Sequence, residues 1–181
     1  MDGKINLGCG SNLLPGYVNV DWSSRSGADV ICDLNRAPWP FEADAFSEVL
    51  VEHLIEHLDD PDLMMKEIYR ITRHGARVRI ITPHFSSYQS YGDLSHQRHR
   101  GLSVLLPYCD AGWNSFGARN GVHFRLLRKR LLFGRSPLAW PGRIIAGVSP
   151  EFYQNYFAFI FPCRNMEFIL ETVKQNEKSP A

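Results

Sequence analysis

Two short segments near the start of the chain carry residue types suited to holding a nucleoside. The apolar run at residues 4–7 leads into Gly8-Cys9-Gly10, and the run at residues 17–20 ends in Asp21. Glycine lets the backbone turn sharply and approach a ligand, and a carboxylate can accept hydrogen bonds from two ribose hydroxyls. Because an α/β sheet binds such ligands where its strands end, this pairing predicts an adenosine-containing ligand.

The sequence between these two segments narrows the class of ligand. The dinucleotide pattern G-x-G-x-x-G is incomplete because Leu13 stands where the third glycine belongs, and Pro15-Gly16 leave room for one helical turn at most. A pyrophosphate is normally bound at the N-terminus of a longer helix. The nucleotide-binding pattern G-x-x-x-x-G-K-[ST] does not occur in the sequence. We therefore expect an adenosine ligand without a phosphate chain.

Three more residues are candidates for the nucleoside end of this site. Trp22 follows the acid directly, and its ring either stacks on adenine or packs in the core. Asp33 ends a short apolar run, so its carboxylate either accepts from the exocyclic amine of adenine or caps a turn. The backbone of Leu34 would line the same ring.

Residues 53–57 have a second interpretation as a metal site. His53, Glu56 and His57 fit the pattern H-x-x-E-H of inverted zinc peptidases. On a helix the two histidines would share a face and could bind one zinc ion, with the glutamate as general base. A zinc hydrolase is thus the main alternative, although the segment starts at a strand end and leaves only one turn before the next element.

Histidines are frequent in the segment that follows the expected fifth strand. His96 and His99 follow Asp93, and either imidazole could take a proton from a hydroxyl or amine substrate, because imidazole titrates near neutrality. His84 is a further candidate for the same role. A metal site and a self-bonded polar loop are the other interpretations of residues 93–99, and we expect no metal.

The pattern of apolar residues predicts the elements that position these groups. Alternating strands and crossovers predict an α/β fold with a Rossmann-like, mostly parallel sheet, covered by helices on both faces. A helix begins at Asp59-Asp60-Pro61 and ends at His74-Gly75. A long lid follows at residues 83–122. We expect strands at residues 4–8, 17–21, 28–32, 47–52, 76–82, 123–133 and 167–174, and a helix at 151–160.

Length and composition indicate the number of domains and the general class of the protein. The 181 residues are 44% hydrophobic, which suits one domain, with a cofactor half at 1–82, an acceptor side at 83–174 and a frayed tail at 175–181. The 20 basic and 19 acidic residues give no field that favours nucleic acid. Four scattered cysteines and no membrane-length apolar run indicate a cytoplasmic protein without a transmembrane segment. The basic run at 125–130 leaves peripheral membrane contact open, and the sequence assigns no oligomeric state.

Several of these stretches, taken in order, resemble class I S-adenosylmethionine-dependent methyltransferases, in particular a compact branch with a short glycine loop. The similarity runs in register over about residues 4–84 and more loosely beyond. The matching pieces are Asn6-Leu7-Gly8-Cys9-Gly10-Ser11, Val18-Asn19-Val20-Asp21, Ile31-Cys32-Asp33-Leu34, the run at residues 40–49, the run at residues 51–58 and the run at residues 67–78.

The resemblance implies S-adenosylmethionine as cofactor and assigns roles to the matching positions. Gly8, Gly10 and the adjoining backbone of Leu7 and Cys9 would contact the methionine portion. Asp21 would bind the ribose, Asp33 and Leu34 the adenine, and Glu52-His53 would lie beside the methyl-bearing sulfonium. The acceptor is expected to be a small molecule or a glycan- or lipid-linked precursor. A protein that binds an adenosine ligand without catalysis is the second alternative.

Overall fold

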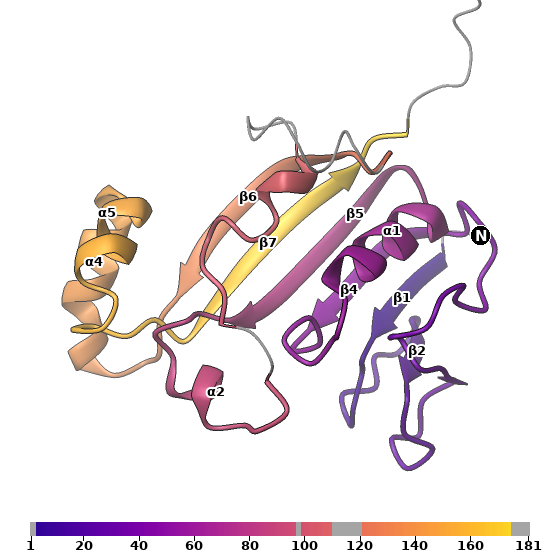
Figure 1. Cartoon of the computed structure of the whole chain (residues 1–181), viewed down its shortest axis with the longest axis horizontal. Helices are drawn as coiled ribbons and strands as arrows, with labels where there is room; N and C mark the ends of the chain where they lie inside the picture. The colour runs from indigo at the N-terminus through magenta and orange to yellow at the C-terminus, as the bar shows by residue number, and fades with distance from the viewer. Residues whose placement is uncertain (1–2, 97–98, 110–120, 175–181) are drawn as a thin grey trace, which may run out of the picture.

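The computed structural model describes residues 3–96, 99–109 and 121–174. A seven-stranded sheet in the order β3-β2-β1-β4-β5-β7-β6 forms its centre (Figure 1). The first five strands of this order are parallel, and β7 is antiparallel to both of its neighbours. The predicted α/β class with a mostly parallel, Rossmann-like sheet is confirmed. The strands are β1 (Gly3–Leu7), β2 (Val18–Asp21), β3 (Val30–Ile31), β4 (Phe46–Glu52), β5 (Thr72–Pro83), β6 (Phe124–Leu132) and β7 (Asn165–Thr172).

The order of the strands reverses at β1, which has β2 on one side and β4 on the other. In this register Leu7 lies beside Val20 and Val51, so β1, β2 and β4 all end at one edge of the sheet. An open α/β sheet binds its ligands at the carboxyl ends of the strands beside such a reversal. Residues 8–17, which connect β1 to β2, form turns and contain no helix.

Helix α1 (Pro61–Ile71) begins as predicted, since the Asp60 side chain caps it and a proline occupies its first position. It ends at Ile71 rather than at His74-Gly75. The reason is Thr72, whose extended backbone already pairs with β4 while its hydroxyl donates to the Ile68 carbonyl at 2.6 Å. Strand β5 therefore starts four residues before the predicted position at 76.

The segment between β5 and β6, where a lid was predicted, packs in part against the main core. Its described parts contain α2 (Tyr88–Tyr91) and the 3-10 helix η1 (Leu106–Tyr108). Leu102 and Leu105 are buried in the main core, so this part packs as scaffold. Residues 110–120 and the predicted frayed tail at 175–181 lie outside the described residues.

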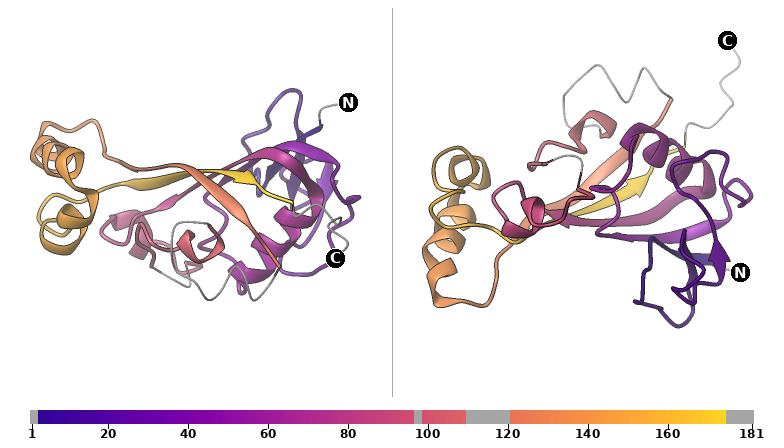
Figure 2. Two further views of the ribbon diagram at one scale, coloured as in Figure 1. Left: turned by 90° about the horizontal axis from the view of Figure 1, so that it is seen from above. Right: turned by 60° about the horizontal axis from the view of Figure 1, so that its bottom comes forward.

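The two faces of the sheet differ. Helix α1 and the segment with η1 lie on one face, where Val78 and Ile80 of β5 are buried (Figure 2). On the other face Arg79 and Arg130 both pair with Glu167. We expected helices on both faces, but within the described residues none covers this second face of β5, β7 and β6. The Arg-Val-Arg-Ile alternation in β5 explains the difference, because it is typical of a sheet with one solvated face.

The connection from β6 to β7 holds a separate group of helices at one end of the molecule (Figure 1). It consists of η2 (Pro137–Ala139), α4 (Trp140–Val148) and α5 (Pro150–Tyr156). The predicted helix at 151–160 is thus shorter, and α4 was not predicted, because two glycines and a proline obscure its helical pattern. A small apolar cluster around Tyr153 and Cys163 holds the group together. Within the described residues no helix is long and apolar enough to cross a membrane.

Candidate active site

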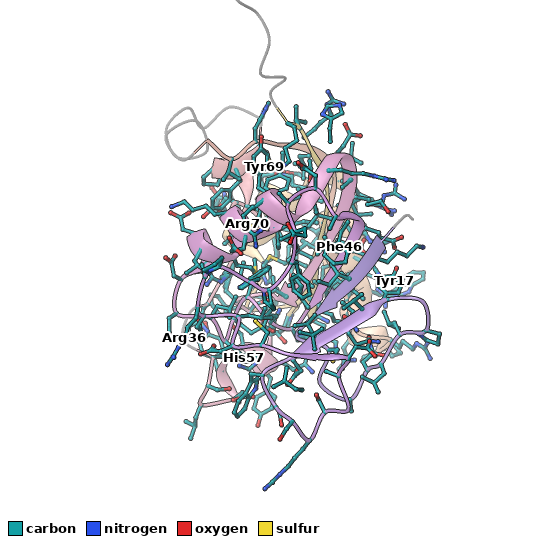
Figure 3. All side chains as sticks on the ribbon, turned by 90° about the vertical axis from the view of Figure 1, so that its right-hand side faces the viewer. Tyr17, Arg36, Phe46, His57, Tyr69 and Arg70 are labelled. Atoms are coloured by element: carbon teal, nitrogen blue, oxygen red, sulfur yellow. The ribbon has the colours of Figure 1, made fainter. Side chains whose placement is uncertain are left out.

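A cavity of about 610 Å³ opens at the edge where β1, β2 and β4 end. Most of the predicted cofactor residues line it, together with residues from the turns after β4 and β5. Figure 3 shows His57 at this end of the molecule, near Arg36 and far from Tyr69. Of the predicted residues, Leu7, Cys9 and Glu52 do not line the cavity, and the first two are buried in the structure. The lining residues are Gly8, Gly10, Asp21, Trp22, Asp33, Leu34, Asn35, His53, Leu54, His57, Leu58 and Ser95.

The glycine turn needs its glycines for two different reasons. Gly8 has a φ of 68°, and a Cβ placed there would lie 2.9 Å from Cδ1 of Leu54. Gly10 has a φ of 52°, but a Cβ there would meet no atom within 4 Å. Both residues adopt a left-handed backbone that a side chain disfavours. Only Gly8 is also required by close packing, whereas open space surrounds Gly10 on the cavity side.

The Asp21 carboxylate ties the end of β2 to the glycine turn. Its Oδ2 accepts from the Gly10 backbone N–H at 2.8 Å, and its Oδ1 accepts from the Ser23 N–H at 2.9 Å. Each carboxylate oxygen can accept a second hydrogen bond. The side chain is therefore held in place by the backbone and still offers one acceptor site per oxygen toward the cavity.

Trp22 and the turn at Asp33 form a further part of the cavity lining. The Trp22 ring is 78% exposed, so it does not pack in the core, which was one of its two interpretations. Asp33 lines the cavity and also caps its own turn, with Oδ1 accepting from the Asn35 N–H at 3.0 Å and Oδ2 pairing with Arg36. The turn-cap interpretation of Asp33 is thus confirmed, and the adenine interpretation stays a prediction for a residue that lines the cavity.

Hydrogen bonds to helix α1 hold the loop that carries Leu34. The Leu34 carbonyl accepts from Nε1 of the buried Trp39, whose backbone N–H donates to Glu67 of the helix at 2.7 Å. Arg70 pairs with Glu67 and donates to the Trp39 and Phe41 carbonyls. Buried charge-assisted bonds of this kind hold a loop in one geometry. Helix α1 therefore fixes the position of the cavity lining at Leu34 through this loop.

His53 lies at the end of β4 in a left-handed backbone conformation, with a φ of 54°. Its Nδ1 lies 3.0 Å from the buried Glu56 carboxylate, and its Nε2 lies 3.3 Å from Asn165 Nδ2. The hydrogen bond to Glu56 raises the pKa of His53 above its usual range. Both ring nitrogens thus have partners, which fixes the orientation of the imidazole at the cavity wall.

His57 is a site residue that sequence reasoning considered only as a metal ligand or structural group. Ser95 Oγ donates to the Asp93 carboxylate at 2.6 Å and lies 2.9 Å from His57 Nδ1. Because the serine has a single proton, and the carboxylate takes it, Nδ1 must be the donor in the second bond. In the neutral ring Nε2 therefore carries the lone pair, and His57 lines the cavity.

The three other histidines proposed as bases occupy different positions. His96 packs against His57 with ring centroids 4.6 Å apart and does not itself line the cavity. His99 contacts Ser90 and Tyr91, outside the cavity lining. His84 is fully buried, and this burial lowers its pKa to about 4. The structure thus brings His53, His57 and His96 together and leaves His84 and His99 apart.

The zinc-peptidase geometry is not formed. Residues 53–58 are a turn rather than a helix, so His53 and His57 do not project from one helical face. Glu56, His57 and His96 do place one potential ligand atom each within 4.8 Å of one another. However, both carboxylate oxygens of Glu56 already accept hydrogen bonds, from His53 at 3.0 Å and from Thr82 at 3.1 Å. The donor set is a hydrogen-bonded network, which does not favour the hydrolase alternative.

Comparison with known proteins finds similarity to methyltransferases in both sequence and fold. Residues 6–80 match the sequence model of a family described as methyltransferase domain, and no curated protein matches the chain. A SAM-dependent methyltransferase from Archaeoglobus fulgidus has a TM-score of 0.66 at 15% identity, covering 94% of this chain and 86% of that chain. One from Mesorhizobium loti has a TM-score of 0.60 at 11% identity, covering 93% and 90%.

A third solved structure contains a product of the methyl donor. It is the Haemonchus contortus phospholethanolamine N-methyltransferase 2 in complex with phosphomonomethylethanolamine and S-adenosylhomocysteine. Its TM-score is 0.55 at 16% identity, and the match covers 97% of this chain and 50% of that chain. At these identities the structural likeness concerns the fold, while the family match concerns the sequence of residues 6–80.

Proposed function

We propose that this chain is a class I S-adenosylmethionine-dependent methyltransferase and that it methylates a hydroxyl or amine of a small molecule or of a glycan- or lipid-linked precursor. The observation that carries the proposal is the cavity itself. Its glycine turn, its anchored acid and its histidine wall come from the ends of neighbouring strands and the turns that follow them.

The chain's own residues fit the methyl donor. The cavity volume of about 610 Å³ falls in the range of roughly 300–1,000 Å³ typical of small-molecule sites. Asp21 keeps two acceptor positions, which suits the two hydroxyls of a ribose. The open space at Gly10 allows a ligand to approach the backbone. We assign the ribose to Asp21, the adenine to Trp22, Asp33 and Leu34, and the methionine portion to the glycine turn.

When bound, the sulfonium of S-adenosylmethionine supplies an electrophilic methyl group. The protein then has to align the acceptor atom with that group and exclude water. His53 is fixed by Glu56 and Asn165, so we assign it to the wall beside the methyl donor. For an acceptor that must lose a proton, His57 Nε2 carries the free lone pair, and we assign proton acceptance to it, with His96 packed behind.

Calorimetry with S-adenosylmethionine and with S-adenosylhomocysteine tests the cofactor part of this proposal. We expect one molecule of either ligand to bind per chain, and the absence of binding of both at millimolar concentration would refute it. Transfer of a labelled methyl group to candidate acceptors tests the catalytic part. Binding without transfer to any acceptor, sugar, lipid or small amine, would favour a non-catalytic adenosine-binding protein.

A further inference from the structure

Helix α4 exposes three large apolar side chains on one face and buries two small residues on the other. Trp140, Ile144 and Val148 are spaced by four residues, so they share one face of the helix, and Val148 is 85% exposed. Gly142 and Ala146 lie on the buried side. Contiguous apolar surface of this kind marks a contact with a protein or a membrane.

The neighbouring segments expose further large apolar side chains. Leu138 precedes α4 and is 84% exposed, and Phe152, Tyr156 and Phe159 are exposed on or just after α5. Eight of the fifteen large hydrophobic residues that are exposed in the described parts of the chain fall within residues 138–160. We call the exposed apolar residues of 138–160 the α4–α5 surface. It projects from one end of the molecule, away from the rest of the sheet (Figure 2).

The charge around this surface is mainly positive. Between residues 133 and 164 the sequence has three arginines and one acid, Glu151, which pairs with Lys129 at 2.8 Å. A hollow of about 380 Å³ beside α4 is lined by three basic residues, Lys129, Arg130 and Arg143. Lys129 and Arg130 pair with Glu151 and Glu167, which do not line the hollow, whereas Arg143 has no carboxylate partner among the described residues. Aromatic and aliphatic residues next to arginines are the composition of segments that rest on anionic bilayers.

The α4–α5 surface also lies on the same edge of the sheet as the cofactor cavity. Leu132 at the end of β6 pairs with Asn165 at the start of β7, which in turn pairs with Pro83 at the end of β5. Asn165 is also the residue that contacts His53 of the cavity wall. A partner seated on α4 and α5 would therefore lie at the same edge of the sheet as the cavity.

We propose that the α4–α5 surface docks this protein on an anionic phospholipid bilayer, with the basic hollow receiving lipid phosphates. The apolar face enters the boundary between headgroups and acyl chains, and Arg143 and Arg135 contact the phosphate layer. This deepens the proposed function and rests on it in one respect. If the chain methylates an acceptor, that acceptor is a lipid or lipid-linked molecule presented by the same bilayer.

Sedimentation with vesicles tests the docking without any need for activity. We expect the full chain to pellet with vesicles of phosphatidylcholine and phosphatidylglycerol, less with phosphatidylcholine alone, and less at high salt because screening weakens the phosphate contacts. The double variant Ile144→Ser/Val148→Ser should reduce the bound fraction roughly tenfold or more, because two apolar side chains that would be buried in the bilayer are replaced by polar ones. Ile31→Ser, on the opposite edge strand, removes another exposed apolar side chain and should bind like wild type.

Trp140 reports which residues enter the lipid. Its fluorescence should shift to the blue on vesicle binding, and Trp140→Phe should bind as well as wild type while losing most of that shift. Circular dichroism of each variant confirms that it folds.

A wild-type chain that stays in the supernatant with anionic vesicles would refute docking. A dimer that Ile144→Ser/Val148→Ser dissociates, without vesicle binding, would assign the surface to a second copy instead. Bound vesicles with no cofactor binding would overturn only the proposed function.

Discussion

The Asp21 carboxylate accepts a hydrogen bond from the backbone nitrogen of Gly10 at 2.8 Å, so the acid after β2 and the glycine after β1 form one unit. Eleven residues separate them in sequence, and the parallel pairing of the two strands brings them together. The bond holds the carboxylate in place before any ligand is present. A site of this kind loses little side-chain freedom on binding.

Replacing Asp21 should lower the affinity for the cofactor more than it lowers the stability of the fold. Asp21→Ala removes the two acceptor positions assigned to the ribose hydroxyls, and we expect S-adenosylhomocysteine to bind ~1–3 kcal/mol less tightly by calorimetry. Asp44→Asn is the matched control, because Asp44 is exposed, pairs with Lys174 and lies outside the cavity lining. Unchanged affinity in Asp21→Ala would remove this residue from the site.

Alanine substitutions at three glycines distinguish the effect of backbone strain from the effect of lost ligand contact. Gly8, Gly10 and Gly16 all have positive φ, and each alanine variant should lose roughly 1–2 kcal/mol of unfolding free energy from the left-handed backbone. Gly8→Ala should lose more, because its Cβ would press on Leu54 at 2.9 Å. We expect Gly8→Ala and Gly10→Ala to lower cofactor affinity and Gly16→Ala to leave it intact. Equal affinities in all three would argue against the glycine turn as a ligand site.

The pair His53–Glu56 predicts a pH-dependent contribution to stability. Because the hydrogen bond to Glu56 raises the pKa of His53, the folded state binds this proton more tightly than the unfolded chain does. The stabilisation is fully present below the unfolded pKa of about 6.5 and is lost as the pH rises through the higher folded value. Glu56→Gln should therefore lower the melting temperature more at pH ~5.5 than at pH ~8.5. The same decrease at both values would contradict this account.

His57 should affect turnover rather than cofactor binding. With an acceptor that loses a proton, His57→Gln should reduce kcat by roughly 10²-fold or more, the usual contribution of a general base. Ser95→Ala should have a smaller effect in the same direction, because it releases the hydrogen bond that holds Nδ1 as the donor. His99→Gln is the control, since His99 contacts Ser90 and Tyr91 outside the cavity lining. Loss of activity in His99→Gln alone would transfer the role to that residue.

Much of the sheet could be predicted because its signals are local. The short runs that end in Gly8, Asp21 and Asp33 each carry their own apolar pattern and their own terminating residue. Element ends were less predictable, since Thr72 starts β5 by pairing with Phe46, a partner distant in sequence. Helix α4 was missed because Pro141, Gly142 and Gly147 are poor helix formers that tertiary packing tolerates here.

The sequence by itself predicted the kind of ligand and the strand ends at which it would bind. A glycine turn too short for a helix, followed by a strand ending in an acid, is encoded within about twenty residues and needs no distant partner. Tertiary structure alone decided that His57, rather than His96 or His99, lines the cavity beside His53. His57 receives its orientation from Ser95 and Asp93, which reach it only after β5 and the turn beyond it have packed against β4. Contacts of that range depend on how whole elements pack, which no local pattern specifies.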